Sequence, residues 1–72
     1  MNTYYLSKLR KEADTYYHLR INVNGVYEVF FHNYKVVSID KANTREEGLK
    51  KLNYHKRKHI LKRISELKKN KV

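Results

Sequence analysis

The first pattern of apolar and polar positions along the chain is helical. Residues 3–13 place four apolar side chains on one face at helical spacing, and the charged residues point elsewhere. These four are Tyr5, Leu6, Leu9 and Ala13. Asp14 and Thr15 interrupt the pattern, so we predict a short helix over residues 3–13.

The next two segments alternate, as half-buried strands do. Residues 16–23 and 26–31 flank Asn24-Gly25, the strongest short-range hairpin signal. A two-residue turn would put Glu28 on the buried face, whereas a three-residue loop with Gly25 in the left-handed conformation shifts the pairing by one residue. We therefore predict that Arg20 lies opposite Glu28. The buried face is then Tyr17, Leu19, Ile21, Tyr27, Val29 and Phe31.

A third strand is predicted over residues 34–39, after a turn at His32 and Asn33. Its two faces are less distinct. We expect Val37 on the open face of the sheet, and the face of Ile39 stays an open alternative. The open face then interleaves aromatic and basic residues: Tyr16, His18, Arg20, Glu28, Phe30, His32, Lys35 and Val37.

The last segment opens with a helix capping box, because Glu47 follows Thr44 by three residues. Its apolar residues fall within a narrow arc of a helix, although Lys56 lies in the same arc. They are Leu49, Leu52, Ile60, Ile64 and Leu67. An unbroken helix from the Thr44 cap to Lys69 would be about 37 Å long, whereas a six-residue strand spans about 20 Å. The helix therefore either breaks near residues 52–55 or extends past the sheet as a basic arm, free to contact a partner.

These elements predict an α+β fold with the order α-β-β-β-α. A three-stranded antiparallel meander carries the helices on one face, and the chain ends in a long basic helix. At 72 residues we expect one small domain. The expected core is Leu6, Leu9, Leu19, Ile21, Val29, Phe31, Leu49 and Leu52.

Charge adds the first indication of a partner. The chain has 17 Lys and Arg against seven Asp and Glu, a formal net charge of +10. Of the 17 basic residues, eleven follow position 44, whereas only three of the seven acidic residues do. A field of this sign attracts phosphates and anionic surfaces. Seven Tyr and two Phe distinguish the chain from a disordered basic tail.

Composition also excludes several classes. The chain has no cysteine, which excludes a disulfide scaffold and a zinc site built on thiolates. It has no apolar run long enough for a signal peptide or a membrane span, so we expect a cytoplasmic location and no membrane partner.

Ten basic residues are candidates for binding nucleic acid. On the C-terminal helix few acidic residues interleave with the basic ones, and phosphate contacts need only cations at loose spacing. In the sheet, basic residues beside aromatic ones could reach bases. The ordinary alternatives are a solvated helix face and an aromatic stripe that is simply packed. The candidates are Lys50, Lys51, Lys56, Arg57, Lys58, Lys62 and Arg63 on the helix, and His18, Arg20 and Lys35 in the sheet.

The sequence contains no motif that supports metal binding or catalysis. His55 and His59 have the i,i+4 spacing of metal ligands, but three cations stand between them and no third ligand is apparent. We expect no metal and no cofactor, and interpret these histidines as pH-tunable positive charge. The sequence shows no paired carboxylates, glycine-rich phosphate loop or nucleophile motif, so we expect no enzyme.

The layout of residues 16–54 is similar to that of two DNA-binding families. Its three strands, Asn24-Gly25 hairpin and helix opening TREEGLKKL resemble the amino-terminal arm-binding domains of phage integrases and the plant ethylene-response DNA-binding domains. This resemblance implies a sheet that enters the DNA major groove, with the helix packed behind it. The N-terminal helix and the basic C-terminal extension depart from that layout.

The complete α-β-β-β-α order is also similar to that of double-stranded-RNA-binding domains. Those domains carry a lysine-rich KKxAK stretch at the last helix. Here Lys50 and Lys51 are followed by Leu52 and Asn53, and the usual Gly-Pro turn before the second strand is absent.

We interpret the chain as a small regulatory or architectural nucleic-acid-binding protein of phage or mobile-element type, with DNA favoured over RNA. The alternative is a small inhibitor or adaptor whose basic helix binds an acidic surface of a host protein. A membrane-surface role is disfavoured, because the C-terminal helix lacks Trp and Phe. A homodimer through that helix stays an open alternative.

Overall fold

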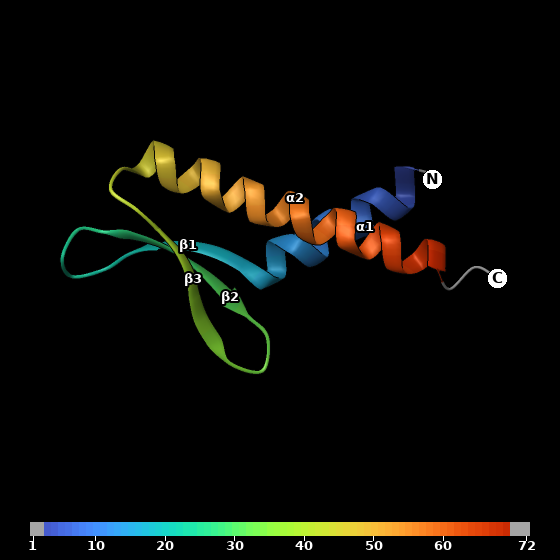
Figure 1. Ribbon diagram of the computed structural model, residues 1–72, viewed down its shortest axis with the longest axis horizontal. Helices are drawn as coiled ribbons and strands as arrows, with labels where there is room; N and C mark the ends of the chain where they lie inside the picture. Colours follow the sequence, from blue (N-terminus) through green and yellow to red (C-terminus); the bar gives the residue numbers. More distant parts are fainter. Residues whose placement is uncertain (1–2, 70–72) are drawn as a thin grey trace.

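The computed structural model describes the backbone of residues 3–69 and the side chains of residues 5–68. Two helices and three strands follow one another along the chain. They are α1 (Thr3–Tyr16), β1 (Tyr17–Ile21), β2 (Tyr27–His32), β3 (Val36–Ala42) and α2 (Arg45–Lys69). The strands form one antiparallel sheet in the order β1-β2-β3, and α2 packs along it while α1 lies beside the C-terminal half of α2 (Figure 1). The predicted α+β order is confirmed.

The junction of α1 and β1 differs from the prediction. Asp14 and Thr15 do not end the helix, which continues to Tyr16. The Thr15 hydroxyl donates to the carbonyl of Lys11 at 2.9 Å, and His18 Nε2 donates to the carbonyl of Thr15 at 2.8 Å. These bonds satisfy polar groups in the last turn, which lets the helix pass directly into the strand.

Tyr16 was therefore wrongly placed on the open face of the sheet. Its ring centroid lies 5.8 Å from that of Phe31 and 5.8 Å from that of His59. It packs between the sheet and α2. Tyr16 is the last residue of α1, so the alternation of strand residues does not determine its direction.

The register of the first hairpin is confirmed. Arg20 pairs with Glu28, and Gly25 has a φ of 80°. Asn22 organises the loop: its amide nitrogen donates to the carbonyl of Val26 at 2.9 Å, and its side-chain oxygen accepts from the amides of Asn24 and Val26 at 2.8 and 3.0 Å. Only glycine adopts the left-handed conformation at low cost, which explains Gly25 at this position.

A bulge in β3 changes which side chains face the helices. The register shifts between Val29 and Phe30, where Val29 pairs with Asp40 and Phe30 pairs with Ser38. Ile39 is the extra residue. A bulge of this kind exchanges the faces of all residues beyond it. It turns Asp40 and Ala42 towards the helix side, where alternation would have placed Ile39.

Two expectations for the third strand were wrong. Val37 pairs with Phe31 and so lies on the helix side rather than on the open face. Lys35 lies in the turn before β3, since the strand begins at Val36. The prediction followed alternation from residue 34, whereas the β2–β3 turn extends to Lys35.

The core is built around small residues. The buried apolar residues are Leu9, Ala13, Val29, Ala42 and Leu52. Gly48 is also buried; a Cβ at this position would lie 3.0 Å from Leu19 Cδ1 and 3.3 Å from Tyr27 Cβ. Gly48 thus allows α2 to approach β1 and β2 closely.

The expected core is confirmed for Leu9, Val29 and Leu52, while Leu6, Leu19 and Phe31 are half-buried. It is wrong at two positions. Ile21 is 58% exposed at the end of β1, and Leu49 is 40% exposed because Gly48, rather than Leu49, faces the sheet in the first turn of α2.

Helix α2 is continuous over its 25 residues, so the first of the two alternatives, a break near residues 52–55, is wrong. Thr44 caps it, with its hydroxyl accepting from the amide of Glu47 at 3.2 Å. The helix does run past the sheet, but α1 packs against its C-terminal half, so it is not a free arm (Figure 1). Lys56 fits within the inward arc because its Nζ lies 2.9 Å from Asp14 Oδ1 at the end of α1.

Candidate nucleic-acid interface

The side of α2 that faces the rest of the molecule pairs its cations with carboxylates. Three of the seven candidates on this helix form ion pairs, with nitrogen–oxygen distances from 2.9 to 3.5 Å. The pairs are Lys51 with Asp40 and Glu47, Lys56 with Asp14, and Arg63 with Glu12 and Glu66. These three residues link α2 to β3 and α1, and nearby carboxylates already offset their charge.

The two histidines of α2 add to this pairing. His55 Nε2 lies 3.0 Å from Asp40 Oδ2, and His59 Nε2 lies 2.9 Å from Glu12 Oε1. His59 Nδ1 is also 3.5 Å from the hydroxyl of Tyr17. They join α2 to β3, α1 and β1. Among the described residues, no group of three or more His, Cys, Asp and Glu could hold a metal ion.

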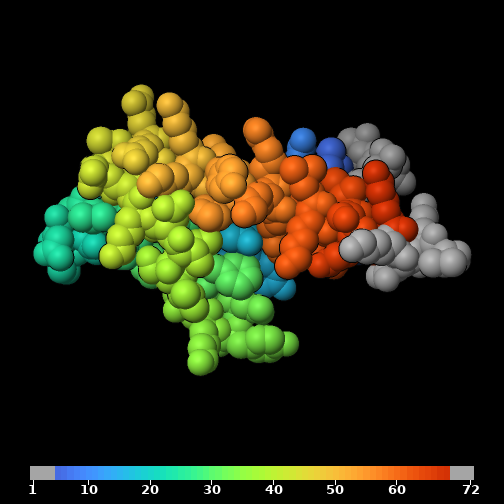
Figure 2. All heavy atoms as spheres, viewed as in Figure 1, coloured from blue at the N-terminus to red at the C-terminus, as the bar shows by residue number. Residues whose placement is uncertain are grey.

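The opposite side of α2 is basic and exposed. We define the outer face of α2 as Lys50, Tyr54, Arg57, Lys58, Leu61 and Lys68, all of them exposed. Among the described residues, none of its cations forms an ion pair, and Lys58 Nζ lies 5.5 Å from the ring centroid of Tyr54. In Figure 2 this helix runs along the top of the molecule, with long side chains projecting from it.

Sequence reasoning missed two features of this face. Tyr54 and Leu61 are 57% and 59% exposed, and they stand between the cations rather than in the core. Lys68 joins the face from the last turns. Helical spacing from Arg57 to Leu61 and Lys68 was the signal that could have found this stripe.

The three candidates in the sheet segment lie elsewhere. Arg20 is exposed on the open face opposite Glu28, and Lys35 is exposed in the β2–β3 turn. The ring of His18 contacts that of His32, with centroids 4.5 Å apart. Because the helices cover the other face of the sheet, Arg20 and His18 lie on the side opposite the outer face of α2. The structure therefore divides the ten candidates among separate surfaces.

The electrostatics of the open face are weaker than its composition indicated. Burial, and then the neighbouring His18 and Arg20, lower the pKa of His32 from its ordinary value. Its Nε2 is buried and has no hydrogen-bond partner among the described residues. Glu28 pairs across the sheet with Arg20 on one side and Lys41 on the other, so a carboxylate stands between the two cations.

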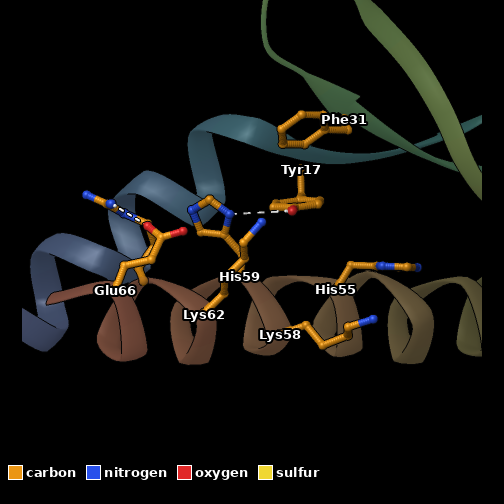
Figure 3. A pocket seen from close by; sticks show the side chains of 8 residues that line it. Tyr17, Phe31, His55, Lys58, His59, Lys62 and Glu66 are labelled. Atoms are coloured by element: carbon orange, nitrogen blue, oxygen red, sulfur yellow. Dashed lines mark hydrogen bonds and ion pairs between the residues drawn. The ribbon is translucent and has the colours of Figure 1, made fainter. Parts of the chain in front are cut away.

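A groove lies along one flank of α2, where the helix passes over β1 and β2. Its cavity volume is about 580 Å³. The rings of Tyr17 and Phe31, with centroids 5.1 Å apart, come from the sheet, and Lys58 and Lys62 come from the helix (Figure 3). His55, His59, Arg63 and Glu66 complete the lining. Sequence reasoning missed the groove because its residues come from three separate elements.

Comparison with protein-family models, curated proteins and solved structures gives no match. The resemblances to integrase arm-binding, ethylene-response and double-stranded-RNA-binding domains therefore stay hypotheses drawn from the sequence layout. Within residues 3–69, neither helix is long and apolar enough to cross a membrane.

Replacing Asp40 with Asn should make stability less sensitive to acid. The hydrogen bond from His55 is the largest cause that lowers the pKa of Asp40 from its ordinary value of 3.8, and the Lys41 amide and Lys51 act in the same direction, while burial opposes them. A carboxylate with a lowered pKa stabilises the fold above the unfolded value, and this stabilisation is lost as pH falls through the folded value.

Thermal melts of wild type and Asp40→Asn at neutral pH and at successive pH values below 4 test this expectation. The variant should melt at a lower temperature near neutrality, and the difference should shrink as the pH falls. Glu46→Gln, at an exposed position in the first turn of α2, is the control. A constant difference at every pH would show that the pairing of Asp40 with His55 does not stabilise the fold.

Proposed function

We propose that this protein binds nucleic acid and that its outer face of α2 contacts the phosphate backbone. The observation that carries the proposal is the segregation of charge on α2. Five of the seven acidic residues pair with Lys51, Lys56 and Arg63 on the inward side. Within residues 5–68, the cations of the outer face form no ion pair with a carboxylate.

This arrangement suits a polyanion with repeated charges. Each phosphate that a Lys or Arg neutralises releases condensed counterions, which favours binding without demanding fixed geometry. At 25 residues, α2 is about 37 Å long, close to one turn of duplex DNA at about 34–36 Å. The outer face itself runs from Lys50 to Lys68, about 27 Å along the axis, and can therefore contact several successive phosphates.

Base reading by the open face of the sheet, as in the integrase-like layout, has less support. That face offers Arg20, but Glu28 lies beside it in the register, and the lowered pKa of His32 favours its uncharged form. We therefore propose DNA or RNA binding chiefly through the backbone, with DNA as the first choice, in a regulatory or architectural role.

A second candidate function is favoured by the exposed apolar residues of the same face. Tyr54 and Leu61 lie seven residues apart on one side of α2, which is the spacing of anchors in helices that dock into a protein groove. With the surrounding cations, they would suit an acidic protein surface. This interpretation keeps the interface but changes the partner.

Fluorescence anisotropy with labelled duplex DNA, duplex RNA and single strands at two salt concentrations tests the proposal. We expect binding at low salt, a steep linear fall of log K with log salt, and displacement by heparin or bulk DNA. If no nucleic acid binds at low salt, the proposal fails and an acidic protein becomes the leading partner.

A further inference from the structure

The groove beneath the flank of α2 combines an aromatic floor with a cationic rim. Tyr17 lies at its centre, with its ring centroid 5.1 Å from that of Phe31, 5.5 Å from that of His59 and 6.4 Å from that of His55. The Tyr17 and His55 rings are nearly parallel, at an interplanar angle of 11°. Figure 3 shows these rings between the strand above and the helix below.

Within residues 5–68, the rim of the groove carries two lysines that are not paired with a carboxylate. Lys58 and Lys62 are exposed and form no ion pair among the described residues. The carboxylate of the groove, Glu66, is held by Arg63 at 3.0 Å, which offsets its repulsion of an anion. Burial raises the pKa of Tyr17, so its phenol stays neutral, and its hydroxyl lies 3.5 Å from His59 Nδ1.

The size of the groove suits a small planar ligand. Its volume of about 580 Å³ lies within the range of about 300–1,000 Å³ that small-molecule sites occupy. Aromatic side chains that line a basic groove are the usual platform for nucleic-acid bases, because every base has a face that can stack. A base in a duplex is already stacked on both sides and cannot enter.

We infer that the groove takes one unpaired nucleotide of a single strand, with its base against Tyr17 and Phe31 and its phosphate at Lys62. This inference rests on the proposed function and narrows its substrate. Lys58 belongs to both the rim and the outer face of α2, so a strand that leaves the groove continues directly onto that face. Single-stranded or frayed nucleic acid is thus preferred over a closed duplex.

Two groove variants and one control separate this site from general backbone binding. The probes are a short oligothymidylate and a GC-rich blunt duplex. Phe31→Leu removes the ring but keeps apolar volume, and Lys62→Gln removes the rim charge from an exposed position that the fold does not require. Arg57→Gln removes a charge from the outer face, away from the groove.

Loss of base stacking should weaken oligothymidylate binding by Phe31→Leu about 5- to 100-fold, with duplex binding little changed. Lys62→Gln should also weaken the single strand more than the duplex. Arg57→Gln should weaken both probes alike. Because Phe31 is half-buried, circular dichroism must first show that its variant is folded. If Phe31→Leu does not fold, the comparison of single strand and duplex rests on Lys62→Gln.

Nuclear magnetic resonance of the wild type gives a test without substitutions. Oligothymidylate should shift the ring resonances of Tyr17 and His59, whereas the duplex should mainly shift residues of the outer face. Thymidine 5′-monophosphate should produce the same shifts far more weakly. If the mononucleotide binds as tightly as the oligomer, the groove binds a free nucleotide rather than a nucleotide of a single strand.

The outcomes for the groove and for the proposed function are distinct. If both groove variants weaken single strand and duplex equally, and the ring resonances of Tyr17 and His59 stay unmoved, the groove inference is wrong and backbone binding stands. If neither probe binds wild type at low salt, both proposals fail together.

Discussion

Leu52→Ala is expected to lower the free energy of unfolding by about 2–5 kcal/mol. Leu52 is 8% exposed and is the one large apolar residue of α2 among the buried side chains described. Helix α2 contacts α1 and all three strands, so a cavity beneath it weakens contacts throughout the molecule. Domains typically have a total stability of about 5–15 kcal/mol, so the variant would lose a large share of it.

Chemical denaturation followed by circular dichroism measures this loss. The matched control is Leu61→Ala, which makes the same substitution in the same helix at a position 59% exposed. Its effect should stay within about 0.5 kcal/mol, as for most surface changes. Equal losses at the two positions would mean that α2 packs against the sheet through a different face.

The sequence predicted the first hairpin in detail because one charged residue, Glu28, would be buried in one of the two possible registers and exposed in the other. Only the three-residue loop keeps Glu28 out of the apolar face and opposite Arg20, and the structure has that pairing. The third strand offered no such constraint. Its apolar residues stand on both faces, so the bulge at Ile39, which turns Asp40 and Ala42 towards the helices, could not be anticipated.

The end of α1 and the course of α2 were uncertain for a related reason. The length of α2 left a break or an overhang open, and Lys56 interrupted its apolar arc; in the structure the helix is continuous and Lys56 pairs with Asp14 of α1. Contacts between residues this far apart in the chain leave no trace in local periodicity. The same holds for His59, which meets Glu12 and Tyr17 from α1 and β1.

The sequence predicted which segment carries the basic residues of the candidate site, but not which of them share a surface. Counting Lys and Arg after position 44 located the basic segment, but a count cannot tell a cation facing solvent from one paired beneath the helix. Lys51 and Lys56 are of the second kind, and Lys50 and Arg57 of the first. That division makes the decisive functional comparison possible.

Replacing the outward cations Lys50, Arg57 and Lys58 with Gln should weaken nucleic-acid binding about equally for every sequence. The slope of log K against log salt should shrink by about 0.9 for each lost contact on duplex DNA. The matched control replaces the inward cations Lys51, Lys56 and Arg63 with Gln. Both triple variants lose three positive charges, so any difference between them reports direct contact rather than the overall field of the protein.

The inward triple variant should keep most of the wild-type salt slope, because its cations already pair with carboxylates. It should also remain folded, since these ion pairs are partly exposed to solvent and such pairs contribute about 0–1 kcal/mol each. Arg20→Ala provides the third comparison. If the sheet reads bases, this substitution should cost about 1–3 kcal/mol on a preferred site and little on random DNA; backbone binding by α2 predicts little change on either. Equal slopes for the two triple variants would exclude the outer face of α2 as the interface, and a sequence-dependent loss at Arg20 would then assign that interface to the sheet.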